Sequence, residues 1–417
     1  MENERPPNFR RRRILAAGAL ILAAGAVAAF FVLRDPGDVS NPTATFTAPP
    51  AKPVKAKPTT VAWPFYGFDA ARTKWFRTKV NLGSPYRRLW SFRGKKVLEF
   101  TPVLDSTGLY LLDNGATVRR LDKRTGHQIW RHNLGSLAAS SPALPGDGHV
   151  YVVTLLTSPG SGHGAATSLN ATTGKITWSK QLPSRAESSP LVVGNRMIFG
   201  TEDGTVFALD KRNGHTIWTY SAGGSVKAAI ALSGGRLYFG DYGGNIQAVS
   251  LSSGKQIWSS SQGGRFYSTP AVAWGRIYEG STDGRLYSMT TSGQLAWARQ
   301  TGSYVYSSPA VANIPGLGPT VYAGSYDGTF YAWNAKTGST NWTYNAGGKI
   351  SGGAVVIGDL VWFSDLGNKR VIALKARSGR RSFQIGTGAF NPAVTDGATM
   401  FVDGYGDSFA FKPIHRR

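Results

Sequence analysis

An aromatic residue returns about every forty residues through most of this 417-residue chain, and this spacing constrains the fold more than any other feature. The gaps between successive members are 40, 48, 40, 40, 39, 45 and 41 residues. A repeat of this period is typical of β-propellers and solenoids, which are built from copies of one small unit. The members are Trp90, Trp130, Trp178, Trp218, Trp258, Trp297, Trp342 and Phe383.

The clearest repeat unit, residues 190–218, predicts four short strands separated by glycine-containing turns. The turns are Gly-Asn, Glu-Asp-Gly and Lys-Arg-Asn-Gly, and glycine can take the positive φ that tight hairpins require. The chain contains 52 Gly and 12 Trp, as expected for many short strands joined by tight turns. The expected strands cover residues 190–193, 197–200, 205–210 and 215–220.

The two ends of the repeat array complement each other. The array begins at residues 88–92 with a fourth strand that has no first three, and it ends at 392–411 with three strands and no fourth. Pairing these ends would close a ring without leaving an open sheet edge. We therefore predict an all-β fold, an eight-bladed β-propeller of four-stranded repeats over residues 63–417.

The N-terminal region has the pattern of a membrane signal. Residues 1–13 end in four arginines, and residues 14–33 contain neither charge nor proline, which is long enough to cross a bilayer. The positive cluster predicts a cytoplasmic N-terminus and an extracytoplasmic propeller on a single-pass anchor. A cleaved twin-arginine signal with a site at residues 26–28 remains the alternative. Residues 34–62, rich in Pro, Thr and Lys, are expected to form a disordered linker.

The charge of the chain favours anionic partners. The formal net charge is +24, of which residues 1–62 contribute 9 − 4 = +5 and residues 63–417 contribute 38 − 19 = +19. Such a surface suits phospholipid headgroups, wall polymers or nucleic acid, or is simply a solvated basic surface. Nucleic acid is not expected for a domain outside the cell. The chain has no Cys, so disulfides and thiolate chemistry are excluded.

The repeat motifs resemble those of the pyrroloquinoline-quinone (PQQ) repeat family. The resemblance spans about residues 90–411 and is carried by Ser-Ser-Pro-Ala-Val at 307–311, Tyr-Ala-Gly-Ser-Tyr-Asp-Gly at 322–328 and Leu-Asp-Lys-Arg-Thr-Gly-His-Gln-Ile-Trp at 121–130. It implies an eight-bladed propeller. One branch of this family contains quinone-dependent dehydrogenases with calcium, and another contains BamB-like assembly scaffolds without a cofactor.

The chain departs from the dehydrogenase branch. The vicinal Cys pair that the resemblance implies against the quinone is absent, and most Asp residues are explained by turns. The six His form no metal-binding spacing, and Ser-Ser recurs from blade to blade as a structural motif would. We therefore expect no catalytic, cofactor-binding or metal-binding residues, with PQQ and calcium disfavoured.

A ligand site is best sought where the repeats differ. Just before each first strand the repeats disagree, and aromatic and charged residues there would converge on one mouth of the channel. That convergence predicts a binding site for a peptide or polar ligand, or aromatic residues that merely fill the channel. The candidate residues are Glu99, Phe100, Glu187, Lys227, Phe266, Tyr267, Tyr306, Lys349 and Phe390, with Tyr304 beside them.

The sequence thus predicts a membrane-anchored, non-catalytic scaffold or binding module for envelope proteins or anionic wall polymers, and we expect it to be monomeric. Two alternatives remain open. One is a PQQ-dependent dehydrogenase-like or other channel-based enzyme. The other is a small-ligand sensor, which the 13-residue cytoplasmic tail disfavours because it has no room for a signalling domain.

Overall fold

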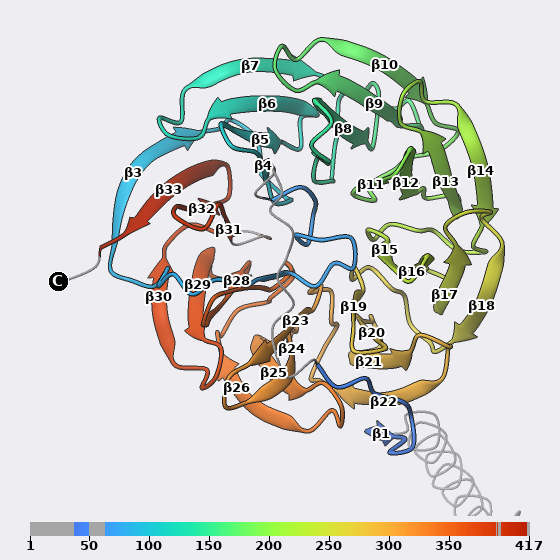
Figure 1. Ribbon diagram of the computed structural model, residues 1–417, viewed down its shortest axis with the longest axis vertical. Coiled ribbons are helices and arrows are strands. Elements are labelled where there is room, and N and C mark those ends of the chain that lie inside the picture. Colours follow the sequence, from blue (N-terminus) through green and yellow to red (C-terminus); the bar gives the residue numbers. More distant parts are fainter. Residues whose placement is uncertain (1–36, 50–62, 389, 391–392, 415–417) are drawn as a thin grey trace, which may run out of the picture. The chain divides into compact units, whose positions relative to one another are not determined.

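The computed structural model describes residues 37–49, 63–388, 390 and 393–414. The chain divides into two units, residues 1–39 and 40–417, and the second contains a ring of eight β-sheets (Figure 1). The predicted eight-bladed propeller is confirmed. The expected membrane span at 14–33 lies outside the described residues. Within the described part of the chain, no helix is long and apolar enough to cross a membrane.

Blades 1 to 4 follow one another along the chain. Blade 1 consists of β4 (Val103–Leu104), β5 (Gly108–Leu112), β6 (Thr117–Asp122) and β7 (Gln128–Asn133). Blade 2 consists of β8 (His149–Thr154), β9 (Ala165–Asn170) and β10 (Ile176–Gln181), and a single bridge from Ala143 to Tyr151 replaces its first strand. Blade 3 consists of β11 (Leu191–Val193), β12 (Arg196–Gly200), β13 (Thr205–Asp210) and β14 (Thr216–Ser221). Blade 4 consists of β15 (Ala231–Ser233), β16 (Arg236–Gly240), β17 (Asn245–Ser250) and β18 (Gln256–Ser261).

Blades 5 to 8 complete the ring. Blade 5 consists of β19 (Ala271–Ala273), β20 (Arg276–Gly280), β21 (Arg285–Thr290) and β22 (Leu295–Gln300). Blade 6 consists of β23 (Ala310–Ile314), β24 (Gly318–Gly324), β25 (Thr329–Asn334) and β26 (Thr340–Asn345). Blade 7 consists of β27 (Val355–Ile357), β28 (Leu360–Asp365), β29 (Arg370–Lys375) and β30 (Arg381–Ile385), joined by β2 (Trp75–Phe76). Blade 8 consists of β31 (Ala393–Thr395), β32 (Met400–Asp403) and β33 (Asp407–Pro413) with β3 (Tyr86–Arg93).

Blade 8 closes the ring by pairing the two ends of the repeat array. Strand β3 pairs antiparallel with β33, with Tyr86 opposite Pro413 and Arg93 opposite Asp407. Figure 1 shows the blue β3 as the outermost strand beside the red β33. The predicted closure is therefore confirmed, and it leaves blade 8 with four strands like its neighbours.

The recurring Trp and Gly lock each blade to the next. The indole N–H of Trp218 in blade 3 donates to the carbonyl of Leu251 in blade 4, at 3.2 Å. A Cβ on Gly254 would lie 2.6 Å from the Trp218 ring, and Gly254 also has a φ of +69°. Only glycine combines that backbone conformation with so close an approach. The same contact recurs around the ring, which explains why both residues repeat.

The Phe at the last repeat position follows from the closure. Blade 8 has no hairpin turn between its third and fourth strands, because these come from opposite ends of the array. Phe383 therefore packs on Tyr86 and Phe411 instead, with ring centroids 4.8 and 6.0 Å apart. A Trp at position 383 would find no carbonyl to accept its indole N–H, because the turn that supplies this carbonyl in the other blades is absent from blade 8.

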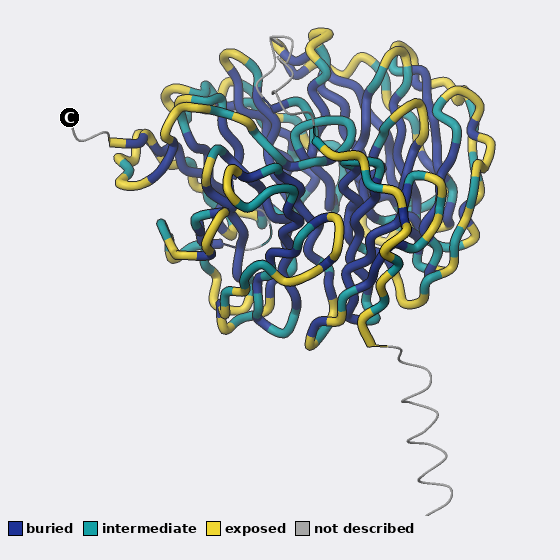
Figure 2. The backbone as a smooth tube through the Cα atoms, turned by 60° about the horizontal axis from the view of Figure 1, so that its bottom comes forward, coloured by how far each residue is buried: buried dark blue, intermediate teal, exposed yellow. Residues whose placement is uncertain are grey.

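Burial is graded from the channel outward, as Figure 2 shows. The inner three strands of the blades are largely buried, whereas the fourth strands alternate between exposed and half-buried residues, as in β18. Strand β22 is the exception, because Ala296, Trp297 and Ala298 are all buried.

Part of the expected linker covers β22. β1 (Val39–Ser40) leads into residues 41–49, and the backbone N–H of Asn41 donates to the carbonyl of Ala296 at 2.7 Å. Arg276 donates to the carbonyls of Ala44 and Thr45. The segment 40–49 is thus held on blade 5 by specific hydrogen bonds.

Residues 63–76, which we call the floor segment, cross the central channel. Its backbone bonds to the first strands of blades 1, 4, 5, 6 and 7 and to the equivalent segment of blade 2. The partners are Leu104, Leu144, Leu232, Val272, Val311 and Val356, each two residues beyond the Ser-Ser-Pro position of its blade. The floor segment therefore closes the channel at one level. In Figure 1 it appears as the blue trace inside the ring.

Two buried cations fix the floor segment. Arg72 is fully buried and donates to the carbonyls of Tyr66, Ser189 and Ile230. Lys74 is also buried and donates to the carbonyl of Pro309 at 3.2 Å. Both residues have positive φ, +56° and +53°, a conformation that side-chain-bearing residues rarely adopt. The hydrogen bonds to three blades thus offset local backbone strain.

Candidate functional site

One variable residue from each of blades 1 to 7 lies at or next to the open end of the channel. Each of these residues lies three positions before the proline of the Ser-Ser-Pro motif, or before the residue that replaces this proline. Together they form what we call the mouth ring. Its described members are Glu99, Ala139, Glu187, Lys227, Tyr267, Tyr306 and Ser351. The two positions that follow it are mostly Ser, Thr, Ala or Gly, so the blades differ mainly where they face the mouth.

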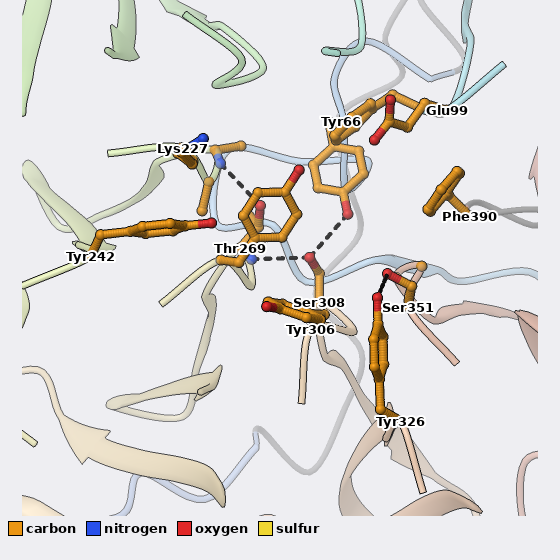
Figure 3. Close-up of a pocket in the computed structure, with 16 residues that line it drawn as sticks. Tyr66, Glu99, Lys227, Tyr242, Thr269, Tyr306, Ser308, Tyr326, Ser351 and Phe390 are labelled. Carbon is orange, nitrogen blue, oxygen red and sulfur yellow. Dashed lines mark hydrogen bonds between the residues drawn. The ribbon is translucent and has the colours of Figure 1, made fainter. Parts of the chain in front are cut away.

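The mouth ring opens into a cavity of about 320 Å³. Six of the predicted residues line it together with residues from the floor and from the turns between second and third strands, as Figure 3 shows. The lining residues are Tyr66, Glu99, Phe100, Lys227, Ala228, Ala229, Tyr242, Tyr267, Thr269, Tyr306, Ser308, Tyr326, Ser351, Gly352, Gly353 and Phe390. The volume suits a few side chains or a small polar ligand.

Five tyrosines form a continuous row along blades 4 to 6. This tyrosine arc consists of Tyr242, Tyr267, Tyr304, Tyr306 and Tyr326. Successive rings meet mostly edge to face, with centroids 6.3 Å apart for Tyr242 and Tyr267 and 4.9 Å apart for Tyr306 and Tyr326. Edge-to-face packing fixes the orientation of these rings, several of which line the cavity.

One end of the arc meets a compact charge cluster. The Lys227 ammonium lies 2.6 Å from Glu187 and 2.7 Å from Glu202, and the Tyr267 hydroxyl donates to Glu187 at 3.2 Å. Burial lowers the pKa of Lys227, but the two carboxylates more than reverse this effect and raise it overall. Burial also raises the pKa of Glu187 against the opposing pull of Lys227. Lys227 therefore stays protonated and neutralises much of the acid around it.

The opposite side of the mouth is held by Glu99 and two phenylalanines. Glu99 accepts a hydrogen bond of 2.7 Å from the side-chain amide of Asn114, and burial raises the pKa of Glu99. Phe100 packs edge to face with Tyr66, with centroids 5.7 Å apart, and Phe390 lines the cavity on the same side as Glu99 and Tyr66 (Figure 3). This side offers a carboxylate next to apolar rings.

A chain of hydroxyl groups joins the blades between mouth and floor. The N–H of Ser141 donates to Ser189 Oγ at 2.8 Å, and the N–H of Thr269 donates to Ser308 Oγ at 3.0 Å. The Tyr66 hydroxyl donates to the same Ser308 Oγ at 3.0 Å, which ties the floor segment to blade 6. These contacts explain most of the repeated Ser-Ser-Pro motif as bonding between blades, although the buried Ser307 Oγ has no hydrogen-bond partner among the described residues.

Three of the nine predicted residues, and Tyr304 beside them, lie outside the cavity lining. Glu187 lies behind it, in contact with Lys227, and Lys349 lies above it with its ammonium 5.7 Å from the Tyr326 ring centroid. Phe266 is fully buried and packs on Tyr287. Phe266 precedes the mouth ring by one residue, so alternation along the chain turns its side chain into the wall between blades.

Sequence reasoning missed the contributions of Tyr66, Tyr242 and Tyr326. Tyr242 and Tyr326 occupy the turn between second and third strands, where other blades have Asn114 or Glu202. That variation was visible in the repeats and could have identified them. Tyr66 had no comparable signal, because nothing in a single sequence indicates that the segment before the repeats enters the channel.

The described residues of the mouth do not fit the ligand set of a PQQ–calcium centre. Among the described residues, no group of three or more His, Asp or Glu side chains converges where it could hold a metal ion. Calcium prefers several carboxylate and carbonyl oxygens. Glu187 is already engaged by Lys227 and Tyr267, and the floor segment fills the channel below. We derive no reaction step through this cofactor.

The fold and the mouth define a class of protein, a propeller of PQQ-type repeats with a closed floor and an open aromatic mouth. A family model described as outer membrane protein assembly factor BamB matches residues 114–261, 208–315 and 302–385. The chain belongs to this family. A search of curated protein sequences gave no significant match.

Solved structures share this fold at low sequence identity. BamB from Moraxella catarrhalis is 22% identical with a TM-score of 0.62, and the match covers 79% of this chain and 100% of that one. Quinohemoprotein alcohol dehydrogenase from Comamonas testosteroni is 15% identical with a TM-score of 0.70, covering 86% and 81%. A europium-containing methanol dehydrogenase is 15% identical with a TM-score of 0.69, covering 84% and 98%. At these identities the likeness establishes the fold alone.

Proposed function

We propose that this protein is a non-catalytic binding module that holds a partner protein at the open mouth of its propeller. The observation that carries the proposal is the tyrosine arc around a cavity of about 320 Å³ on a rigid ring. Tyrosine supplies a large amphipathic contact area at low conformational-entropy cost, and it is enriched at binding hot spots. A rigid scaffold that carries variable mouth residues is suited to recognition.

The proposed setting is the cell envelope. The arginine cluster and apolar run of residues 10–33 support a single-pass anchor with the propeller on the extracytoplasmic side. The family description, an outer-membrane assembly factor, agrees with an envelope protein as partner. An anionic wall polymer is the other partner class that the net charge of +24 allows.

The test is site-specific photo-crosslinking in the native membrane. Tyr304, the member of the tyrosine arc that is 48% exposed, would be replaced by a photo-reactive phenylalanine analogue in the full-length chain. We expect one predominant cross-linked protein, and we expect its yield to fall at least about ten-fold when Tyr306→Ala and Tyr326→Ala are added, since hot-spot losses reach 2 kcal/mol or more.

The matched control places the same photo-reactive group at Ile257. This residue is 42% exposed on β18, at the outer edge of blade 4, so it reports non-specific neighbours. The mouth would be ruled out as the binding site if the same partner were cross-linked at both positions. It would also be ruled out if the two Tyr→Ala changes left the cross-linking yield at position 304 unchanged.

A further inference from the structure

Exposed cations surround the mouth outside the tyrosine arc. Arg265 and Lys349 occupy equivalent positions in blades 5 and 7, each two residues before a mouth-ring residue. The Arg265 guanidinium lies 5.7 Å from the Tyr242 ring centroid, and the Lys349 ammonium lies 5.7 Å from that of Tyr326. Lys369, in the second turn of blade 7, lies 5.5 Å from the Tyr405 ring centroid. We call these three residues the rim cations.

The rim cations differ from the cation inside the mouth. Lys227 has two carboxylate partners, whereas the part of the chain that the structure describes places no carboxylate within ion-pair distance of any rim cation. An exposed cation seated on an aromatic ring is partly ordered, so it loses less conformational freedom on meeting an anion. The rim cations are therefore positioned to bind anionic groups of a ligand.

The interior of the mouth differs from the rim. Glu99 lines the cavity, and the ammonium of Lys227, which also lines it, is already paired with Glu187 and Glu202, so a dense anion at the centre would meet the Glu99 carboxylate and a cation that is already engaged. A cationic ligand is also disfavoured, because the chain's own Lys227 and Arg265 already lie over Tyr242 and Lys349 lies over Tyr326. Uncharged groups with N–H donors suit this interior, since Glu99 and the tyrosine hydroxyls can accept hydrogen bonds.

From this arrangement we infer the chemistry of the partner, on the basis of the proposed function. The mouth accepts an extended peptide segment whose uncharged centre enters the cavity and whose flanking acidic residues meet Arg265, Lys349 and Lys369. A continuous polyanion fits less well, because its charges would also have to pass the Glu99 carboxylate in the cavity lining. The excess positive charge of residues 63–417, +19, would speed the encounter with such a partner.

Selection from a random peptide library tests this inference. The full-length protein in detergent micelles is the bait, and binders that survive on a Tyr306→Ala and Tyr326→Ala variant are discarded. We expect the remaining peptides to carry Asp or Glu on both sides of an uncharged core. Synthetic copies should bind about three- to ten-fold more weakly to an Arg265→Gln and Lys349→Gln variant, and the difference should shrink at high salt.

The control removes two lysines from the opposite face of the ring, Lys175→Gln and Lys255→Gln, which are exposed in the turns between third and fourth strands. It changes net charge equally and should leave peptide affinity unchanged. Selected peptides that are basic or uncharged would overturn the acidic-flank inference while leaving a peptide-binding mouth intact. Failure to select any mouth-dependent peptide would overturn both. Binding of polyphosphate that is lost with the rim cations but survives both Tyr→Ala changes would favour a wall polymer instead.

Discussion

The two ends of the channel are built from similar residue types but use them differently. At the floor, Arg72 and Lys74 are buried and bonded to backbone carbonyls. At the mouth, Arg265 and Lys349 are exposed and rest on tyrosine rings. A buried cation must have partners, because an unpaired one costs several kcal/mol. An exposed cation has no such requirement and remains available to a ligand.

This difference indicates that the floor contributes mainly to stability and the mouth mainly to binding. The floor segment joins six blades through backbone hydrogen bonds, so its loss affects the whole ring. The mouth residues contact their neighbours mainly through ring edges and one charge cluster, so most of them can change at low cost. We therefore expect floor variants to alter stability and mouth variants to alter binding.

The largest effect is expected for Arg72→Ala. It removes a guanidinium that satisfies buried carbonyls of blade 3, blade 4 and the floor segment, and it should lower the free energy of unfolding by about 3–5 kcal/mol. Denaturant titration of the full-length protein measures this. Arg72→Gly is the matched variant, and it should be about 1 kcal/mol less damaging because φ is +56° here. A loss below about 1 kcal/mol for Arg72→Ala would show that the floor does not hold the blades together.

Lys74→Met should change the pH dependence of stability. Burial, followed by repulsion from Arg72, lowers the pKa of Lys74 from 10.5 to about 7. Between these values the unfolded chain binds a proton that the folded protein does not, so this group makes stability rise with pH from about 7 to about 10.5. Below about pH 7 both states are protonated and its contribution is constant.

We therefore expect the parent to gain about 3–4 kcal/mol relative to Lys74→Met between pH 7 and pH 10, measured as the free energy of unfolding at each pH. The control is Lys255→Met, which changes an exposed lysine and should run parallel to the parent. Parallel curves for Lys74→Met as well would mean that Lys74 is solvated and the floor is open to water.

The smallest effect on stability is expected at the mouth. Tyr306→Ala removes edge-to-face contacts with Tyr267, Tyr304 and Tyr326 and should cost only about 1 kcal/mol, whereas Tyr306→Phe should be close to neutral. Thermal unfolding of both variants beside the parent measures this. A loss as large as that of Arg72→Ala would remove the contrast between the two ends and make the tyrosine arc a structural core.

The sequence predicted the ring well because its signals are local and repeated. Trp, Gly and Ser-Ser-Pro recur because each blade repeats one contact with the next, and the predicted β13 range, 205–210, agrees with the structure. The mouth was predicted in part, since Glu99, Lys227 and Tyr306 vary where the blades otherwise agree. The contribution of Tyr66 was not predictable, because it depends on a floor segment that crosses the channel through contacts more than two hundred residues away in sequence.

The pairing of β3 with β33 also sets an order of events during synthesis. The strand that emerges first among the repeats must wait for the one made last, more than three hundred residues later. Until then β3 has no strand to pair with. The floor segment likewise lacks its hydrogen-bond partners in the blades that have not yet been synthesised. Ring closure is thus a late step, and a chain that stops short of residue 407 would expose both β3 and the aromatic face that Phe383 and Phe411 cover. In a propeller closed in this way, the first strand of the array finds its pairing partner only after the last strand has been synthesised.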